Sequence, residues 1–178
     1  MSAPRTPAVA AAEGTGNAPA ATAAAAKPAG AKLGAAKPPN VVRATWKGGQ
    51  RFEAGRLNGP VLQIDGTGET GQSPVDALLS ALASCVSIDV VGIIAKRKTP
   101  ASRVEITVTA QRADATPRRI VEIRLDFAID GVGIDRGQAM RAIDLSLNKY
   151  CSVRDSLARD ILYSWSLTLN GEPGAPGE

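Results

Sequence analysis

The feature that most constrains this fold is a long apolar stretch in the middle of the chain, residues 73–95. Ser73 can act as the N-cap of a helix, and Pro74 suits the first helical position, where no backbone donor is needed. Asp76 completes a capping-box pattern three residues after the cap. A basic run then suits the negative end of a helix: Lys96, Arg97 and Lys98. The stretch therefore predicts one long helix with Cys85 near its middle.

This helix is apolar on nearly every side, so other elements must wrap it. Leu78, Leu82, Cys85 and Asp89 follow one another at helical spacing and define one face. Its Ser and Asp residues argue against a membrane-spanning segment, so no membrane partner is expected. We expect a sheet folded around a central helix.

Composition excludes several classes of function. The chain has no histidine, which removes Ser-His-Asp and Cys-His nucleophiles and most zinc and haem sites. Two cysteines cannot complete a four-ligand zinc site, so no metal or cofactor is expected. The net charge of +4 comes without a basic stripe or a base-stacking surface, which argues against nucleic acid as a partner.

Low-complexity composition marks both ends of the chain. Residues 1–40 are rich in Ala and Pro and predict a disordered tail without a secretory signal, which favours a cytoplasmic protein. Residues 41–170 predict one folded domain, and residues 171–178 a flexible C-terminal tail.

Alternating apolar and polar residues predict the strands of this domain. Three strands precede the central helix, and the first is expected to bury Val42, Ala44 and Trp46. Two strands near 104–110 and 121–129 predict a hairpin, and a last strand follows over 161–169. Between them, Asp135 can cap a second helix, whose expected inner side comprises Ala139, Ala142, Ile143, Ser146, Leu147 and Tyr150. A short helix is expected to start at Ser152. This order predicts an α+β fold.

The two cysteines are the candidates for chemistry. Cys85 lies in the central helix and Cys151 just before the short helix, where thiolate character is favoured. Either thiol could also serve only for packing. In a reducing compartment a disulfide between them would be transient and redox-linked.

Two motifs carry a resemblance to a known family. The pattern Ser-Pro-x-Asp-x-Leu-Leu-x-Ala-Leu-x-x-Cys ends at Cys85, and Lys-Tyr-Cys-Ser-Val surrounds Cys151. Together they resemble the OsmC/Ohr family over residues 41–170. Asp89 and the sequence Arg-Ala-Ile-x-Leu-Ser from Arg141 make the chain more similar to the YhfA-like branch than to Ohr proper.

The resemblance implies an OsmC-like intertwined homodimer, with antiparallel sheets wrapped around the long central helices. It also implies a peroxidase for organic hydroperoxides, in which Cys85 becomes a sulfenic acid and Cys151 condenses with it. A dithiol, in the Ohr branch a lipoylated protein, would then restore both thiols.

The family also pairs its reactive thiol with an Arg from the N-terminal strands. Arg51 is the best match here and Arg56 the second. Ohr proteins carry a Glu directly after the helical proline, whereas this chain has its acid one step later, at Asp76. Two roles are therefore open for Asp76: the carboxylate that holds the Arg, or a helix cap alone. Asp89 would oppose thiolate formation at Cys85 unless Arg51 or Arg56 neutralised it. These departures leave open a non-enzymatic alternative, a redox sensor or a binder of a small apolar ligand.

Overall fold

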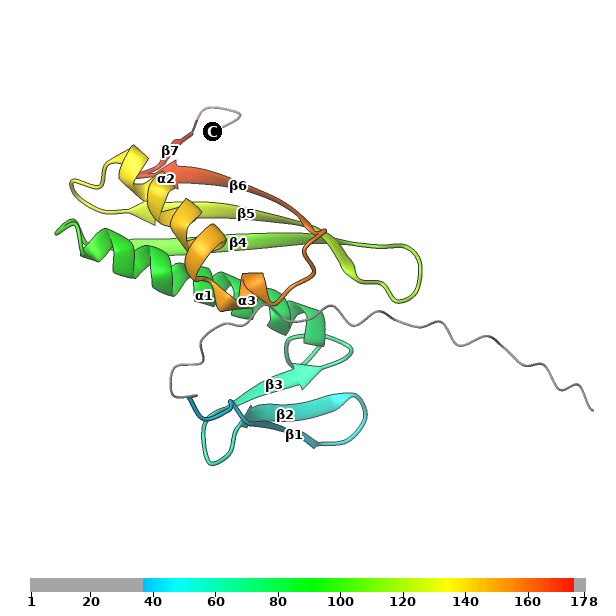
Figure 1. The fold of residues 1–178 in the computed structure, drawn as a ribbon. Coiled ribbons are helices and arrows are strands. Elements are labelled where there is room, and N and C mark those ends of the chain that lie inside the picture. Colours follow the sequence, from blue (N-terminus) through cyan, green and yellow to red (C-terminus); the bar gives the residue numbers. More distant parts are fainter. Residues whose placement is uncertain (1–36, 175–178) are drawn as a thin grey trace, which may run out of the picture. The chain divides into compact units, whose positions relative to one another are not determined.

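The computed structural model describes residues 37–174, and the expectations for residues 1–36 and 175–178 fall outside that range. Three antiparallel strands open the described chain: β1 (Val42–Trp46), β2 (Arg51–Arg56) and β3 (Val61–Asp65) (Figure 1). The β2–β3 turn places Asn58 at a φ of 60°, which suits the Asn-Gly signal read from the sequence. All three predicted strands are present.

Burial in this first sheet differs from our expectation. Val42, Ala44 and Trp46 were predicted to face a core, but all three are exposed, and Trp46 keeps 65% of its surface accessible. Alternation in a strand reports that one face is apolar, not which molecule covers it. The prediction of a buried face is therefore wrong within a single chain.

The central helix α1 (Pro74–Ala95) forms as its capping signals predict. Asp76 N donates to Ser73 Oγ at 3.2 Å, and Ser73 Oγ donates to Asp76 Oδ2 at 2.7 Å. One face is buried, at a spacing of four residues: Leu82, Val86, Val90 and Ile94. Leu78, expected on the same face as Leu82, is exposed.

Contrary to our sequence argument, α1 is long and apolar enough to cross a membrane by length and composition. Its packing against β4 and α2 gives a core helix.

The second sheet has the order β4-β5-β6-β7: β4 (Arg103–Arg112), β5 (Ile120–Asp130), β6 (Leu162–Leu169) and β7 (Glu172–Pro173). The predicted hairpin is present as the antiparallel pair β4–β5. By contrast, β5 and β6 are parallel, so the sheet is not purely antiparallel as expected. Strand β7 lies at the start of the segment expected to be a tail.

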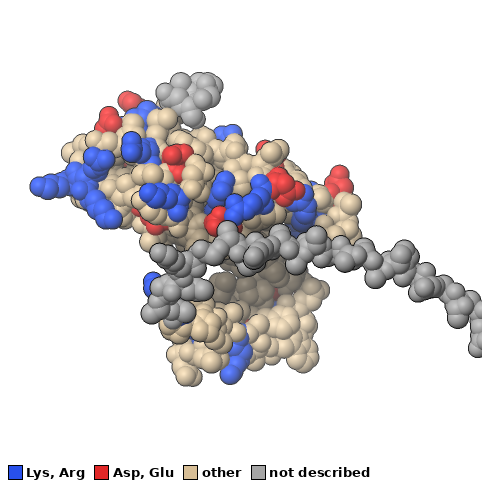
Figure 2. Space-filling model, in the orientation of Figure 1, with Lys and Arg blue, Asp and Glu red and all other residues tan. Residues whose placement is uncertain are grey.

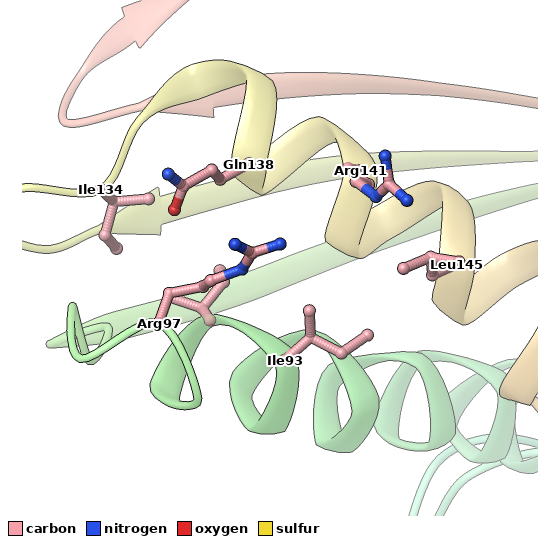
Figure 3. A pocket seen from close by; sticks show the side chains of 7 residues that line it. Ile93, Arg97, Ile134, Gln138, Arg141 and Leu145 are labelled. Atoms are coloured by element: carbon pink, nitrogen blue, oxygen red, sulfur yellow. The ribbon is translucent and has the colours of Figure 1, made fainter.

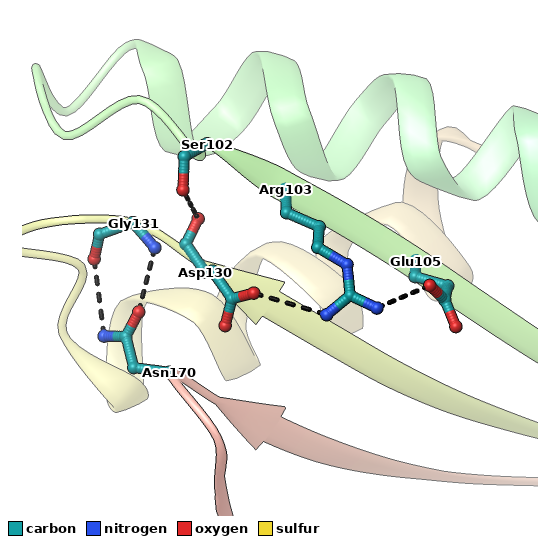
Figure 4. Close-up of polar contacts among 6 residues, drawn as sticks. All are labelled: Ser102, Arg103, Glu105, Asp130, Gly131 and Asn170. Carbon is teal, nitrogen blue, oxygen red and sulfur yellow. Dashed lines mark hydrogen bonds and ion pairs between the residues drawn. The ribbon is translucent and has the colours of Figure 1, made fainter.

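Polar contacts join the ends of these strands (Figure 4). Arg103 forms ion pairs with Glu105 and Asp130, and Ser102 Oγ donates to the Asp130 carbonyl at 3.1 Å. Asn170 Oδ1 accepts from Gly131 N at 2.9 Å. These contacts fix the end of the sheet beside the loop that leads to the second helix.

A helical crossover makes the parallel pair possible. It consists of α2 (Arg136–Leu145), a π-helical turn η1 (Ser146–Tyr150) and α3 (Ser152–Asp155). Asp135 Oδ1 accepts from Gln138 N at 3.0 Å, as the predicted N-cap. Helices α1 and α2 lie side by side on one face of the sheet (Figure 1).

The π-turn explains one wrong prediction. The expected inner residues of α2 are buried, except that Tyr150 is half exposed. A wider turn changes the angular spacing of the residues that follow it. Tyr150 therefore rotates outward, where Lys149 Nζ lies 5.4 Å from its ring centre.

Candidate functional site

Two free thiols from distant parts of the sequence meet in the folded chain. Cys85 lies at the middle of α1 and is half-buried, whereas Cys151 follows η1 and is only 3% exposed. The two side chains are neighbours, close enough that Cys85 raises the pKa of the Cys151 thiol. The crossover thus brings Cys151 against the central helix, and both sulfurs are reduced.

Local backbone geometry holds Cys151 in place. Its N–H donates to Ser146 O at 2.9 Å, which closes the π-turn. Its sulfur accepts from Arg154 N at 3.4 Å, so Cys151 itself is the N-cap of α3. A short helix at Ser152 was predicted, but its cap is the thiol that precedes it. π-helical turns are frequent at functional sites, which makes this junction a candidate.

The surroundings of Cys151 favour its protonated form. Burial, and then the neighbouring side chain and charge of Cys85, raise the pKa of the Cys151 thiol to about 11. Backbone N–H groups of Arg154 and Val153 act in the opposite direction and only partly offset this effect. The Cys151 thiol is therefore held in its neutral form.

Ser146 connects the crossover to α1 just beyond the thiols. Its buried hydroxyl lies 3.2 Å from Val86 O and 3.4 Å from Asp89 Oδ2. Asp89 thus faces a hydroxyl, and within residues 37–174 it forms no ion pair with Arg51 or Arg56. The sequence motif pointed to Asp89, but the contact with Ser146 was not anticipated.

The other predicted residues lie apart from the thiol contact. Arg51 and Arg56 are exposed on β2, and the Arg56 guanidinium donates to Asn40 Oδ1 at 3.1 Å. In the described part of the chain, neither arginine bonds to Cys85 or Cys151. Asp76 is occupied by Ser73 in the capping box of α1, the role that we considered for it from the sequence.

Two residues near Cys151 were missed by sequence reasoning. The guanidinium carbon of Arg154 lies 4.8 Å from the ring centre of Tyr163, a cation–π contact. Arg154 Nε and the Tyr163 hydroxyl are buried, and neither has a hydrogen-bond partner within residues 37–174. Burial, and to a lesser extent the charge of Cys151, raise the pKa of Tyr163, while Arg154 lowers it. The inward register of Tyr163 on its strand was the one available signal.

Solvent reaches this region through an open hollow, lined by residues of η1 and α3 that include Leu147, Cys151 and Arg154. Within residues 37–174, no group of three or more His, Cys, Asp or Glu side chains is arranged to hold a metal ion. The chemistry that this arrangement can support is therefore that of a thiol pair beside an open hollow.

Comparison with known proteins identifies the family. The family model described as OsmC-like protein matches residues 66–165. Protein YhfA of Escherichia coli strain K12 is 34% identical over 112 residues, which cover 62% of this chain and 84% of YhfA.

Solved structures share the fold. An OsmC-like protein from Mycoplasma pneumoniae has a TM-score of 0.64 at 19% identity, covering 74% of this chain and 97% of that one. The organic hydroperoxide resistance protein OhrB of Bacillus subtilis has a TM-score of 0.52 at 14% identity, covering 73% and 98%. At these identities the likeness concerns the fold alone. The matched family model and the identity with YhfA show that this chain belongs to the OsmC-like family.

Proposed function

We propose that this protein reduces organic hydroperoxides through its two thiols. The observation that carries the proposal is that the free thiols of Cys85 and Cys151 are neighbours in the folded chain. Membership of the OsmC-like family supports it, as does a fold shared with a protein named for organic hydroperoxide resistance.

The environments of the two thiols support an order for the proposed steps. Cys85 is the more accessible thiol, whereas Cys151 is buried and held protonated. The Cys85 thiolate attacks the peroxide oxygen, the O–O bond breaks, and the alkoxide takes a proton to leave as the alcohol. Cys85 is then a sulfenic acid.

Cys151 completes the first half of the cycle. Its sulfur attacks the Cys85 sulfur, an S–S bond forms, and the displaced hydroxide leaves as water with the Cys151 proton. Oxidation of Cys85 removes the charge that repels a Cys151 thiolate, so the second step becomes easier once the first has occurred. A dithiol then reduces the disulfide by thiol–disulfide exchange. We expect this reductant to be a small molecule or a lipoylated protein.

We further propose that the protein works as a homodimer. Apolar side chains on α1 remain exposed in one chain, namely Leu78, Ile88 and Val91, and so do Val42 and Trp46 of the first sheet. Large exposed apolar patches mark interaction sites. A second copy would cover them, and its β2 would supply Arg51, or Arg56 as the second choice, as the cation beside Cys85.

The test is rapid mixing of the reduced protein with cumene hydroperoxide, followed by the loss of free thiols and the formation of alcohol. Wild type should react faster than Cys85→Ser and should turn over repeatedly when dihydrolipoamide is present. The matched variant Cys151→Ser should react once and accumulate a sulfenic acid that dimedone traps. A wild-type rate equal to that of Cys85→Ser would disprove the proposal.

Within the described residues Asp89 has no Arg partner, so its charge opposes thiolate formation at Cys85. This observation favours the alternative function, a redox sensor. A sensor would form the disulfide once and show no turnover with any dithiol. The same experiment therefore separates the two functions.

A further inference from the structure

The two sulfurs are reached from different sides of the chain. Cys85 shares a side of α1 with Ala81 and Ile88, one turn before and one turn after it, and both of these residues are exposed. Cys151 is only 3% exposed, but it forms part of the wall of the open hollow at η1 and α3, whereas Cys85 does not. A molecule inside this hollow would therefore meet the Cys151 sulfur first.

The hollow at Cys151 is large enough for a small thiol. It has room for about 330 Å³, many times the space that one water molecule needs. A second hollow, between the end of α1 and α2, is lined by residues that include Ile93, Arg97 and Arg141, and has room for only about 30 Å³ (Figure 3). That space suits little more than a single water. Of these two hollows, the one that could admit a reductant is the one with a cysteine in its wall.

The wall of the hollow at Cys151 carries charges of both signs. Lys149 and Arg154 are basic and Asp155 is acidic. Basic and acidic side chains are also interspersed over much of the molecular face in Figure 2. A strong field that steers a charged ligand needs a cleft lined by one sign of charge, which this wall is not. A neutral thiol is therefore an adequate probe of the hollow.

The chemistry of disulfide exchange also favours attack at Cys151. The sulfur that is attacked decides which thiol leaves, and a thiol of lower pKa leaves faster. Burial is the main cause that raises the pKa of the Cys151 thiol to about 11, so Cys151 is a poor leaving group. Attack on the Cys151 sulfur avoids this difficulty, because Cys85 is then the group that leaves.

We propose that the reductant enters the hollow at η1 and α3 and attacks the Cys151 sulfur of the disulfide. This inference rests on the proposed function, because it concerns the disulfide formed in that cycle. A thiolate of the dithiol forms an S–S bond with Cys151, the Cys85–Cys151 bond breaks, and Cys85 leaves with the electron pair as a thiolate. The second thiol of the reductant then attacks its own bonded sulfur, and Cys151 leaves with the electron pair and takes up that thiol's proton. The reductant becomes a disulfide, and both protein sulfurs are reduced.

The test maps the first bond that a neutral monothiol forms with the oxidised protein. Full-length protein is oxidised with diamide instead of a peroxide, so the result does not depend on peroxidase activity. 2-Mercaptoethanol is then added for short times, and free thiols are blocked with N-ethylmaleimide. Trypsin separates the two cysteines into peptides 57–96 and 150–154, which mass spectrometry distinguishes. The mixed disulfide should be about tenfold more abundant on Cys151 than on Cys85.

Ser152→Trp tests the route to the sulfur. Ser152 is exposed and lies in the wall of the hollow, so an indole there should narrow it and slow reduction of the disulfide by 2-mercaptoethanol about tenfold. Ala115→Trp is the matched control, because Ala115 is exposed in the loop between β4 and β5 and is not part of that wall. It should be reduced at the wild-type rate. Circular dichroism should show that both variants fold.

The outcomes separate this route from the peroxidase function. A mixed disulfide found mainly on Cys85, or equal reduction rates for Ser152→Trp and Ala115→Trp, would overturn the route and leave the peroxidase proposal standing. Failure of diamide to join the two cysteines would overturn both. The expected mapping in a protein that does not react with cumene hydroperoxide would support the route and overturn the peroxidase function alone.

Discussion

The raised pKa of Cys151 makes the stability of the reduced protein sensitive to alkaline pH. A folded-state pKa of about 11, against an ordinary value of 9.0, means that the folded chain holds this proton more tightly than the unfolded chain does. The stabilisation is complete below pH 9 and is lost as the pH rises towards 11. Two pH units correspond to about 3 kcal/mol at the high-pH limit, of which about 2 kcal/mol is lost by pH 11.

The assay is urea unfolding of wild type and Cys151→Ser at a fixed protein concentration, with a reductant present, between pH 8 and pH 11. Subtracting the two free energies of unfolding removes the titration of the Lys residues and of Tyr150, and leaves that of Cys151 together with its small effect on Tyr163. We expect the wild-type advantage to shrink by about 2 kcal/mol over this range. A difference that stays constant with pH would refute the argument.

Cys85→Ser provides a second check on the cause. Burial is the largest contribution to the raised pKa of Cys151 and does not depend on the Cys85 charge. The pH-dependent loss should therefore become smaller in Cys85→Ser but should not vanish. An undiminished loss would mean that the thiol contact contributes nothing.

Further predictions concern stability and assembly. Leu82→Ala empties a fully buried site in α1 and should lower the free energy of unfolding by about 3 kcal/mol in urea titrations, while an effect below about 1 kcal/mol would contradict the packing described here. Ser73→Ala removes the N-cap of α1 and should cost about 1 kcal/mol in the same assay. Ile88→Asp places a charge on an α1 side chain that is 73% exposed, and analytical ultracentrifugation should show monomers if the proposed dimer is correct. Tyr163→Phe deletes a buried hydroxyl without a partner in residues 37–174, so stability should be unchanged or higher, and a loss above about 1 kcal/mol would reveal a hidden partner.

Local sequence signals predicted most helices and strands, because the residues within each element specify its start and its periodicity. The capping box at Ser73 and the apolar run behind it specify α1, and the strict alternation in 121–129 specifies β5. The parallel pairing of β5 and β6 was not predictable in this way, because alternation is identical for parallel and antiparallel neighbours. The π-turn that exposes Tyr150 likewise has no strong local signature.

The candidate site was only partly accessible from the sequence. The motifs around Cys85 and Cys151 identified the thiols, and the structure puts them in contact, while their catalytic roles stay predictions. The contacts of Ser146, Arg154 and Tyr163 could not be predicted, because they depend on which segments the crossover brings together. The roles of Arg51 and Arg56 also stay predictions, since they require a second copy of the chain.

The parallel arrangement of β5 and β6 has a consequence for when reactivity first arises. The crossover that joins these two strands packs on α1, and this packing brings Cys151 to Cys85 from a distant part of the sequence. A chain that is unfolded in this region therefore carries two ordinary, separated cysteines, and the thiol pair exists only in the folded domain.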